Sequence, residues 1–114
     1  MTGAKIRPLK GDRAFRRLSR GQAGGSKHLS LRWRSASHGE VRVGIVVSRK
    51  VGKAVVRNRV RRRLREALRA LLAVSPGFPS SLDLLVIARP SAATASYADL
   101  RGSLAQAMHR ARTP

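Results

Sequence analysis

The sequence predicts a single α+β domain, an α/β sandwich in which helices pack on a small β-sheet. Residues 29–33 alternate apolar with polar side chains, and residues 41–48 are rich in β-branched side chains, which indicates two strands. Apolar residues recur at helical spacing over residues 56–71, which indicates a long amphipathic helix. The 114 residues are enough for one domain with a modest core, so we assign residues 1–114 to it.

The chain begins with a basic segment, residues 1–10, which we expect to be a flexible arm. Asp12 is a suitable helix N-cap, because its carboxylate can accept a hydrogen bond from a free N–H group of the first turn. Phe15 and Leu18 are the large apolar residues that follow. Residues 13–20 are therefore predicted to form a short helix with a narrow buried face.

Two strands and two connections follow the short helix. Residues 22–26 contain two glycines and are predicted to be a flexible link. A third strand in the early part of the chain is left open. A turn at residues 35–39 separates the alternating segment from the β-branched segment. The two strands are predicted to pair as a hairpin.

A basic loop at residues 49–53 leads into the long helix, which is predicted to run from Ala54 or Val55 to Ala73. Two prolines and a glycine within residues 75–79 stop it. Its buried stripe is expected to contain Val56, Val60, Leu64, Ala67, Leu68 and Leu71.

A strand and a helix complete the chain. Residues 83–89 contain a continuous apolar run, which is typical of a central strand, and Pro90 ends it. Residues 96–99 resemble a helix capping box, with Asp99 in place of the usual Glu. The last helix is predicted to end near residue 110. Its buried stripe is expected to contain Tyr97, Leu100, Leu104 and Met108.

The charge of the chain restricts its function. Lysine and arginine total 25 against five acidic residues, which gives a formal net charge of +20. Such a charge on a small domain indicates binding to nucleic acid or to an anionic membrane surface. No apolar run approaches about 20 residues, and there is no secretory-type apolar segment at the N-terminus. We therefore favour nucleic acid over a membrane and expect a cytoplasmic protein.

The cysteine, histidine and acidic residues of the chain do not indicate a catalytic or metal-binding site. Cysteine is absent, which excludes disulfides and cysteine-containing zinc sites. His28, His38 and His109 lack ligand spacing and are expected at the surface, so no metal ligand is predicted. The five acidic residues do not cluster in the sequence as two-metal nuclease chemistry requires. No catalytic residue is predicted, and a protein-only nuclease is a minor alternative.

The residue types favour phosphate binding instead. Free backbone N–H groups at the start of the long helix attract anions, and Gly52 in the basic loop allows a close backbone approach. Residues 57–65 contain six arginines, whose planar guanidinium groups match phosphate. Arg59 and Arg63 are predicted on one flank of the apolar stripe. The other flank is predicted to carry Asn58, Arg61, Arg62, Arg65 and Arg69.

Few side chains are suited to reading bases. Asn58 can hydrogen-bond a base edge, a ribose 2′-hydroxyl or a neighbouring guanidinium group. Phe15 and Trp33 can stack on bases or pack in the core. Because aromatic residues are only 4% of the chain, recognition of many successive bases is not expected.

A β-branched strand, Ser48 followed by two basic residues, and an Arg-Asn-Arg triplet at residues 57–59 in a basic helix occur in this order within residues 41–67. This segment resembles the signature of the bacterial ribonuclease P protein family. The resemblance extends more loosely over residues 9–21 and 83–90, so it covers most of the chain.

The resemblance implies a helix–three strands–helix–strand–helix fold with a mixed four-stranded sheet. It implies the small subunit of a ribonucleoprotein whose catalytic RNA hydrolyses the phosphodiester bond at the 5′ leader boundary of precursor tRNA. The partners would be that RNA, with one protein per RNA, and precursor tRNA. Mg²⁺ would be bound by the RNA–substrate complex, while the protein alone would hold no cofactor and would be inactive. The alternative is a structural RNA-binding protein of the ribosomal type with no role in cleavage.

The resemblance also implies which residues meet each RNA. The catalytic RNA is expected to contact Arg49, Lys50, Lys53, Ala54, Arg57, Asn58, Arg59, Arg61, Arg62 and Arg65. The 5′ leader is expected in a cleft between the first helix and the sheet, at Phe15, Arg16, Ser19, Arg20, Arg32 and Arg89. Ser19 and Arg32 stand where the family usually has aromatic side chains. Arginines are therefore expected to hold the leader electrostatically.

Overall fold

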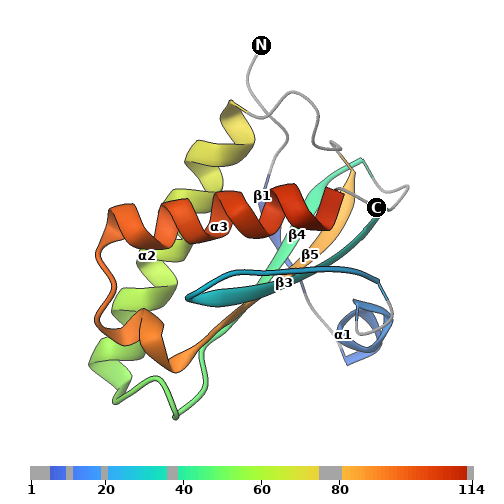
Figure 1. Cartoon of the computed structure of the whole chain (residues 1–114). Helices are drawn as coiled ribbons and strands as arrows, with labels where there is room; N and C mark the ends of the chain where they lie inside the picture. The colour runs from blue at the N-terminus through green and yellow to red at the C-terminus, as the bar shows by residue number, and fades with distance from the viewer. Residues whose placement is uncertain (1–5, 10–11, 19–20, 36–38, 75–80, 113–114) are drawn as a thin grey trace.

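The computed structural model has the predicted α+β fold, with α-helices packed on a mixed sheet (Figure 1). It describes residues 6–9, 12–18, 21–35, 39–74 and 81–112. The helices are α1 (Asp12–Leu18), α2 (Ala54–Ala73) and α3 (Tyr97–Arg112), with a 3-10 turn, η1 (Pro90–Ala93), before α3. The strands are β1 (Ile6–Pro8), β2 (Gln22–Gly25), β3 (Leu29–Ser35), β4 (Val41–Val46) and β5 (Leu82–Ala88).

The strands lie in the order β1-β4-β5-β3-β2. β1, β4 and β5 run parallel to one another, whereas β3 pairs antiparallel with both β5 and β2. The sheet is mixed, as expected, but it has five described strands instead of four. β5 occupies the centre, as its continuous apolar run predicts, because side chains cover both of its faces.

Two predictions about the strands are wrong. β3 and β4 do not form a hairpin, because the more apolar β5 lies between them and pairs with both. The predicted link at 22–26 is largely strand β2, which pairs with β3 through the backbone. Gly21, just before β2, comes so close to β3 that an added Cβ would lie 2.5 Å from the Trp33 carbonyl oxygen. The glycines in this segment have no side chains, so the backbones of the two strands can approach each other closely. They do not indicate a flexible link.

The predicted arm is partly docked. Residues Ile6–Pro8 form β1 on the edge of the sheet, parallel to β4. The Leu9 N–H donates a 2.9 Å hydrogen bond to the Val43 carbonyl oxygen, and the Leu9 side chain is buried. The flexible-arm prediction is therefore wrong for residues 6–9, and the rest of the arm lies outside the described residues.

The helix predictions agree closely with the structure. α2 has the predicted bounds, and α3 ends two residues beyond the predicted end. The Ser96 hydroxyl accepts a 3.1 Å hydrogen bond from the Asp99 N–H, and the Asp99 carboxylate accepts one of 3.4 Å from the Ser96 N–H, which confirms the capping box. Tyr97 is 37% exposed and does not belong to the buried stripe of α3, because it lies in the first turn.

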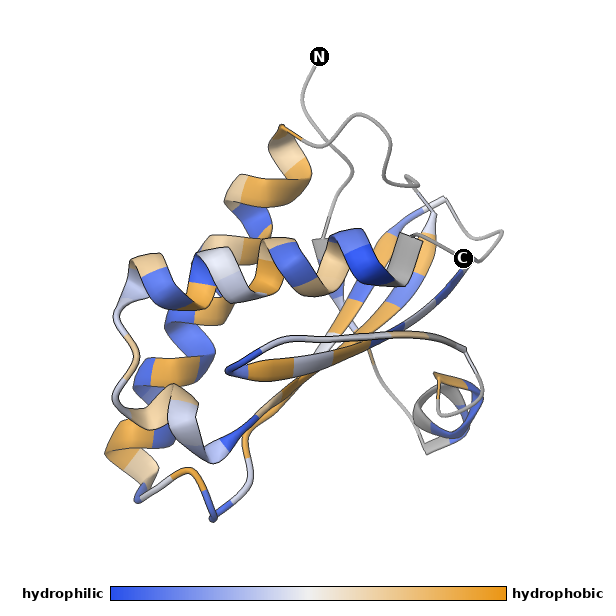
Figure 2. Cartoon of the chain, in the orientation of Figure 1, coloured by the Kyte–Doolittle hydropathy of each residue, from blue (hydrophilic) through white to orange (hydrophobic). Residues whose placement is uncertain are grey.

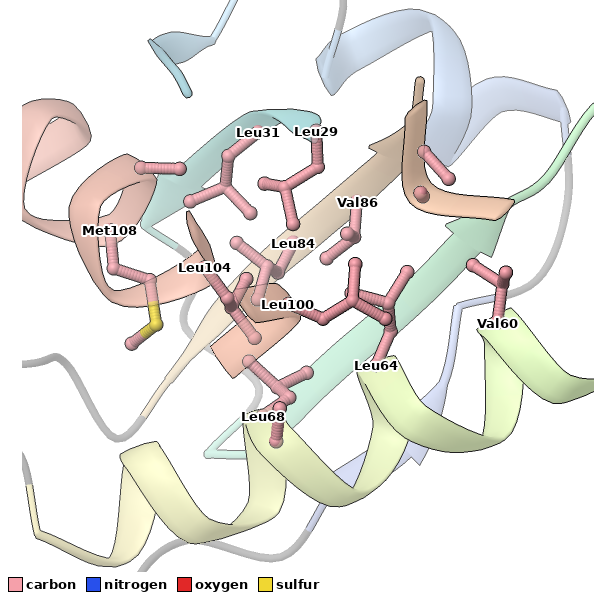
Figure 3. Close-up of a cluster of buried hydrophobic side chains, with 14 of the residues drawn as sticks. Leu29, Leu31, Val60, Leu64, Leu68, Leu84, Val86, Leu100, Leu104 and Met108 are labelled. Carbon is pink, nitrogen blue, oxygen red and sulfur yellow. The ribbon is translucent and has the colours of Figure 1, made fainter. Parts of the chain in front are cut away.

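The two faces of the sheet are covered unequally. α2 and α3 lie on one side and α1 on the other (Figure 1). Between the sheet and the α2–α3 pair lies the main core, where Leu64 and Leu68 of α2 meet Leu100 and Leu104 of α3 (Figure 3). On the α1 face the buried cluster is small and consists of Leu9, Leu18 and Leu85, with Ile87 packed against it.

Candidate nucleic-acid interface

α2 turns the predicted apolar stripe toward the core. Its fully buried members are Val60, Leu64, Ala67 and Leu68, and Val56 and Leu71 pack partly buried at the ends. Figure 3 shows Val60, Leu64 and Leu68 pointing away from α2 toward the core, and Figure 2 shows hydrophilic bands recurring along the helix between apolar ones. Because this stripe fixes the rotation of α2, the arginines must lie on its flanks.

One flank of α2 carries arginines that the protein does not neutralise. We call Arg57, Asn58, Arg61, Arg62 and Arg65 the basic flank. Asn58, Arg62 and Arg65 are exposed, and the other two are half-buried. Within the described ranges, no arginine of the basic flank forms an ion pair, whereas Arg69 lies 3.7 Å from Glu66. The flank is therefore a surface of uncompensated positive charge, as phosphate binding requires.

Asn58 organises its neighbour on the basic flank. Its side-chain oxygen Oδ1 accepts a 3.0 Å hydrogen bond from Nη1 of Arg61. Of the partners that the sequence allowed for Asn58, the neighbouring guanidinium group is the one observed. The bond restricts the rotamers of Arg61, so less side-chain entropy is lost when that arginine binds a phosphate.

Arg59 and Arg63 lie on the other flank, as predicted, and contact the protein itself. Arg59 Nη2 donates a 3.0 Å hydrogen bond to the Ala93 carbonyl oxygen, and Arg63 Nη1 donates one of 2.9 Å to the Ala95 carbonyl oxygen. Sequence reasoning missed these bonds because the acceptors are 34 and 32 positions away and belong to the backbone. Arg59 is thus committed in part to the contact between α2 and the segment before α3.

The basic loop continues the basic flank to the start of α2. Arg49, Lys50, Lys53 and Ala54 are all exposed, while Val51 is 5% exposed and anchors the loop. Lys53 is the N-cap of α2 but makes no side-chain capping hydrogen bond, and the first turn has no acidic residue. The N–H groups of that turn thus keep their capacity to bind an anion at the positive end of the helix dipole.

Gly52 is required by the loop geometry. Its φ of 154° lies at the border of the region that residues with side chains rarely adopt. An added Cβ at this position would lie 3.1 Å from Cγ1 of Val56 in the first turn of α2. The absence of a side chain therefore lets the loop approach the helix start closely.

The α1 face of the sheet carries several residues expected to hold the leader. Strand alternation places Arg32, Val46, Ile87 and Arg89 on this face. Leu18 of α1 packs in the cluster on this face, but Val46 stays 37% exposed and Ile87 half-buried. Arg89 is exposed at the end of β5, and Arg16 is exposed on α1. The partly exposed apolar surface of Val46 and Ile87 thus lies on the same face as these arginines.

The remaining leader residues are placed only in part. Phe15 belongs to α1, but its side chain is not described, and Ser19 and Arg20 lie outside the described residues. Trp33 packs against the main core, so its side chain is on the α2–α3 face and not in the expected cleft. The alternative of Trp33 as a core residue is therefore confirmed, and Arg32 occupies the α1 face.

His28 corrects the expectation of a surface histidine. It is only 8% exposed, and its Nδ1 lies 2.8 Å from the Ser91 hydroxyl. Its backbone N–H donates a 3.1 Å hydrogen bond to the Ser103 hydroxyl. His28 thus joins the start of β3 to η1 and α3, a structural role that no spacing in the sequence reveals. His109 is exposed, and His38 lies outside the described residues.

Two further features concern the parts of the chain that the structure describes. In these parts, no three His, Cys, Asp or Glu side chains are grouped so that they could hold a metal ion. Nor do the helices of these parts include one with the length and apolar character needed to cross a membrane.

The chain resembles known proteins over nearly its whole length. The profile of the family described as Ribonuclease P matches residues 4–112. The ribonuclease P protein component of Thermus brockianus is 52% identical over 108 residues, which cover 95% of this chain and 62% of that protein. The component from Clostridioides difficile is 36% identical over 109 residues, which cover 93% of this chain and 92% of that protein.

Structural similarity agrees with the sequence relationship. The ribonuclease P protein of Thermotoga maritima matches with a TM-score of 0.77 at 27% identity, and the match covers 93% of this chain and 99% of that one. The chain spans about three fifths of the length of the Thermus relatives that it matches.

Proposed function

The chain belongs to the ribonuclease P protein family, and on this premise we propose that it is the protein subunit of a ribonucleoprotein that removes the 5′ leader of precursor tRNA. Its partners are the catalytic RNA, with one protein per RNA, and the precursor tRNA. The complex acts in the cytoplasm. The relatives named above are ribonuclease P proteins, which favours this function over that of a ribosomal-type structural protein.

We assign the chemistry to the RNA and binding to the protein. Mg²⁺ would be held by the RNA–substrate complex and would supply an activated water for phosphodiester hydrolysis. The described interface of this chain offers guanidinium and ammonium groups, which suit phosphate oxygens and not a cation. The protein without RNA is therefore expected to be inactive.

The observation that carries the proposal is the uncompensated charge of the basic flank. Its arginines form no ion pair within the described part of the chain, so their guanidinium groups are available to RNA phosphates. Each phosphate that they neutralise releases counterions, which gives a slope of about −0.7 to −0.9 in a plot of log affinity against log salt. Lower repulsion between the two RNAs also favours Mg²⁺ binding by their complex.

The parallel pairing of β4 and β5 supports a continuous path between the two proposed RNA surfaces. β4 and β5 are parallel neighbours, so the basic loop after β4 and Arg89 after β5 lie at the same carboxyl edge. Val46 faces the α1 side three positions before Arg49. A leader held by Arg16, Arg32 and Arg89 on the α1 side would therefore reach the loop that contacts the catalytic RNA.

Replacement of Arg57, Arg61 and Arg65 by alanine tests the role of the basic flank. The measurement is cleavage of precursor tRNA by the cognate catalytic RNA at physiological Mg²⁺, with R101A as the control because Arg101 is exposed on α3. The triple variant should lose about 100-fold or more in kcat/KM, since each charge-assisted contact contributes roughly 1.5 kcal/mol or more. Unchanged turnover and affinity would refute the assigned role.

Two experiments distinguish the proposed function from a protein-only nuclease and from a structural RNA-binding protein. The first is the cleavage assay without RNA. Cleavage by the purified protein without any RNA subunit would establish a protein-only nuclease and overturn the proposal. Co-purification of the protein followed by sequencing of the bound RNA should return the ribonuclease P RNA. Recovery of ribosomal RNA alone would establish the structural RNA-binding alternative.

A further inference from the structure

A small pocket lies between the sheet edge and the C-terminal half of α2. Its volume is about 300 Å³. The apolar part of its lining comes from Pro8 of β1, Val43 and Ile45 of β4, and Leu68 of α2. The charged part consists of Arg65 and Arg69 from α2. Arg7 of β1 also lines the pocket, but its side chain belongs to the α1 face of the sheet, because Arg7 pairs with Arg42 and Leu9 packs on that face. We call this site the edge pocket.

The edge pocket exists because α2 does not cover the sheet to its edge. Val43 and Ile45 point to the same side of β4 as Val41 and Val47, which are 1% and 5% exposed. Val43 and Ile45, however, are only partly buried. Their exposed surface is apolar area that the fold leaves open to a ligand.

The charges around the edge pocket are suited to an anion. Arg65 has no acidic partner among the described residues. Arg69 lies 3.7 Å from Glu66. The side chain of Arg69 is 64% exposed, so this pair contributes little and can give way to a phosphate.

The edge pocket also continues the basic flank. Arg57, Arg61, Arg65 and Arg69 are spaced four residues apart, so they lie in one row that rises about 6 Å per arginine. The last two arginines of this row line the pocket. An RNA strand whose phosphates follow the row from the start of α2 therefore arrives at an apolar recess with cations on its rim.

We propose that the edge pocket binds one unstacked nucleotide of the RNA that lies along α2. The base rests on Val43, Ile45 and Leu68, since a base presents a flat face that can leave water. Its flanking phosphates bind Arg65 and Arg69. This inference rests on the proposed RNA-binding function and extends the RNA contact from α2 to the edge of the sheet.

A titration of the unmodified protein tests the pocket directly. Methyl resonances of Val43, Ile45 and Leu68 are followed by NMR as adenosine 5′-monophosphate is added, with ribose 5-phosphate at equal concentration as the control. The nucleotide should shift these methyl resonances in a saturable way, while ribose 5-phosphate, which has the same phosphate but no base, should shift them much less. Equal shifts with both compounds, or none with either, would overturn the proposal.

A pocket-filling substitution tests the same site with RNA. Ile45→Trp should weaken binding of the catalytic RNA by about 10-fold with an unchanged salt slope, because the base is displaced while the arginines remain. Val74→Trp is the matched control, since Val74 is 67% exposed at the end of α2 and outside the pocket. An unchanged affinity of a folded Ile45→Trp protein would contradict the proposal.

A charge substitution tests the cationic rim of the pocket. Arg69→Gln should lower the salt slope by about one phosphate, whereas R101Q on α3 should leave it unchanged. Equal slopes for Arg69→Gln and the unmodified protein would contradict an RNA contact at the pocket. Failure of the unmodified protein to activate the catalytic RNA would instead contradict the proposed function, so the two failures are distinguishable.

Discussion

The Arg63 guanidinium group donates a 2.9 Å hydrogen bond to the carbonyl oxygen of Ala95, which ties the flank of α2 to the segment that begins α3. Arg59 makes the equivalent bond to Ala93. Apart from Arg69, which pairs with Glu66, the arginines of α2 therefore divide into two groups. Those on the basic flank have no acidic partner in the described ranges, whereas Arg59 and Arg63 bind the protein.

Arg63→Gln is expected to affect stability more than RNA binding. The free energy of unfolding should fall by about 1 kcal/mol, since the substitution removes one side chain–backbone hydrogen bond. The salt slope of RNA binding should stay within half a phosphate of the unmodified value. Arg61→Gln is the matched comparison and should show the reverse, with normal stability and a slope smaller by about one phosphate. Denaturant titration measures the free energy of unfolding, and RNA binding at several salt concentrations measures the slope. Identical behaviour of the two variants would contradict the division of the arginines into two groups.

Asn58 and Arg61 are expected to be energetically coupled in RNA binding. Asn58→Ala should weaken binding by about 2- to 5-fold, because Arg61 loses the hydrogen bond that restricts its rotamers. In an Arg61→Ala background the same Asn58 substitution should have almost no effect. A double-mutant cycle measures the coupling. Additive effects would mean that Asn58 contacts the RNA independently of Arg61.

Leu18→Ala is expected to separate leader binding from binding of the catalytic RNA. Leu18 is fully buried in the small cluster that attaches α1, so its truncation should cost about 2–5 kcal/mol and loosen α1. Affinity for precursor tRNA should then lose its dependence on leader length, while affinity for the catalytic RNA is kept. Leu100→Ala in the main core is the control for general destabilisation. Equal loss of both RNA affinities in the Leu18 variant would argue against a leader site beside α1.

The sequence predicts those elements whose pattern is local. The bounds of α2 follow from the spacing of Val60 and Leu64 and from the basic loop, and β5 follows from its apolar run. Pairing between distant strands is not local, so the position of β5 between β3 and β4 could not be predicted. β2 escaped prediction because Gly24 and Gly25 carry no side chains from which alternation can be read.

The candidate site shows the same limit. The rotation of α2 follows from its apolar stripe, so the flank of each arginine could be predicted. The acceptors of Arg59 and Arg63, and the contribution of Pro8 to the edge pocket, depend on which backbone segments pack beside α2. That packing is a property of the whole fold and leaves no signal in the spacing of residues 57–65.

Ser103→Ala is expected to destabilise the fold through a buried main-chain group. The Ser103 hydroxyl accepts the hydrogen bond of the His28 N–H, and both residues are buried. Removing the acceptor leaves that N–H unsatisfied, which should lower the free energy of unfolding by about 1–3 kcal/mol. Ser91→Ala is the comparison: the Ser91 hydroxyl also contacts His28, at Nδ1, but Ser91 is exposed, so water can replace its hydroxyl. A larger loss for Ser91→Ala in denaturant titration would contradict this ranking.

Sulfate is expected to stabilise the protein beyond its contribution to ionic strength. The net charge of +20 opposes compaction, and the uncapped start of α2 and the basic flank are suited to an oxyanion. At a sulfate concentration ten times its dissociation constant, one site should add about 1.4 kcal/mol to the free energy of unfolding. Sodium chloride at equal ionic strength should add less, since it screens charge without filling the site. The triple variant of Arg57, Arg61 and Arg65 should lose most of the difference between the two salts. Thermal unfolding followed by circular dichroism measures the stabilisation by each salt. Equal stabilisation by both salts would mean that the salts act by screening general charge repulsion and not by binding to a phosphate-binding surface on α2.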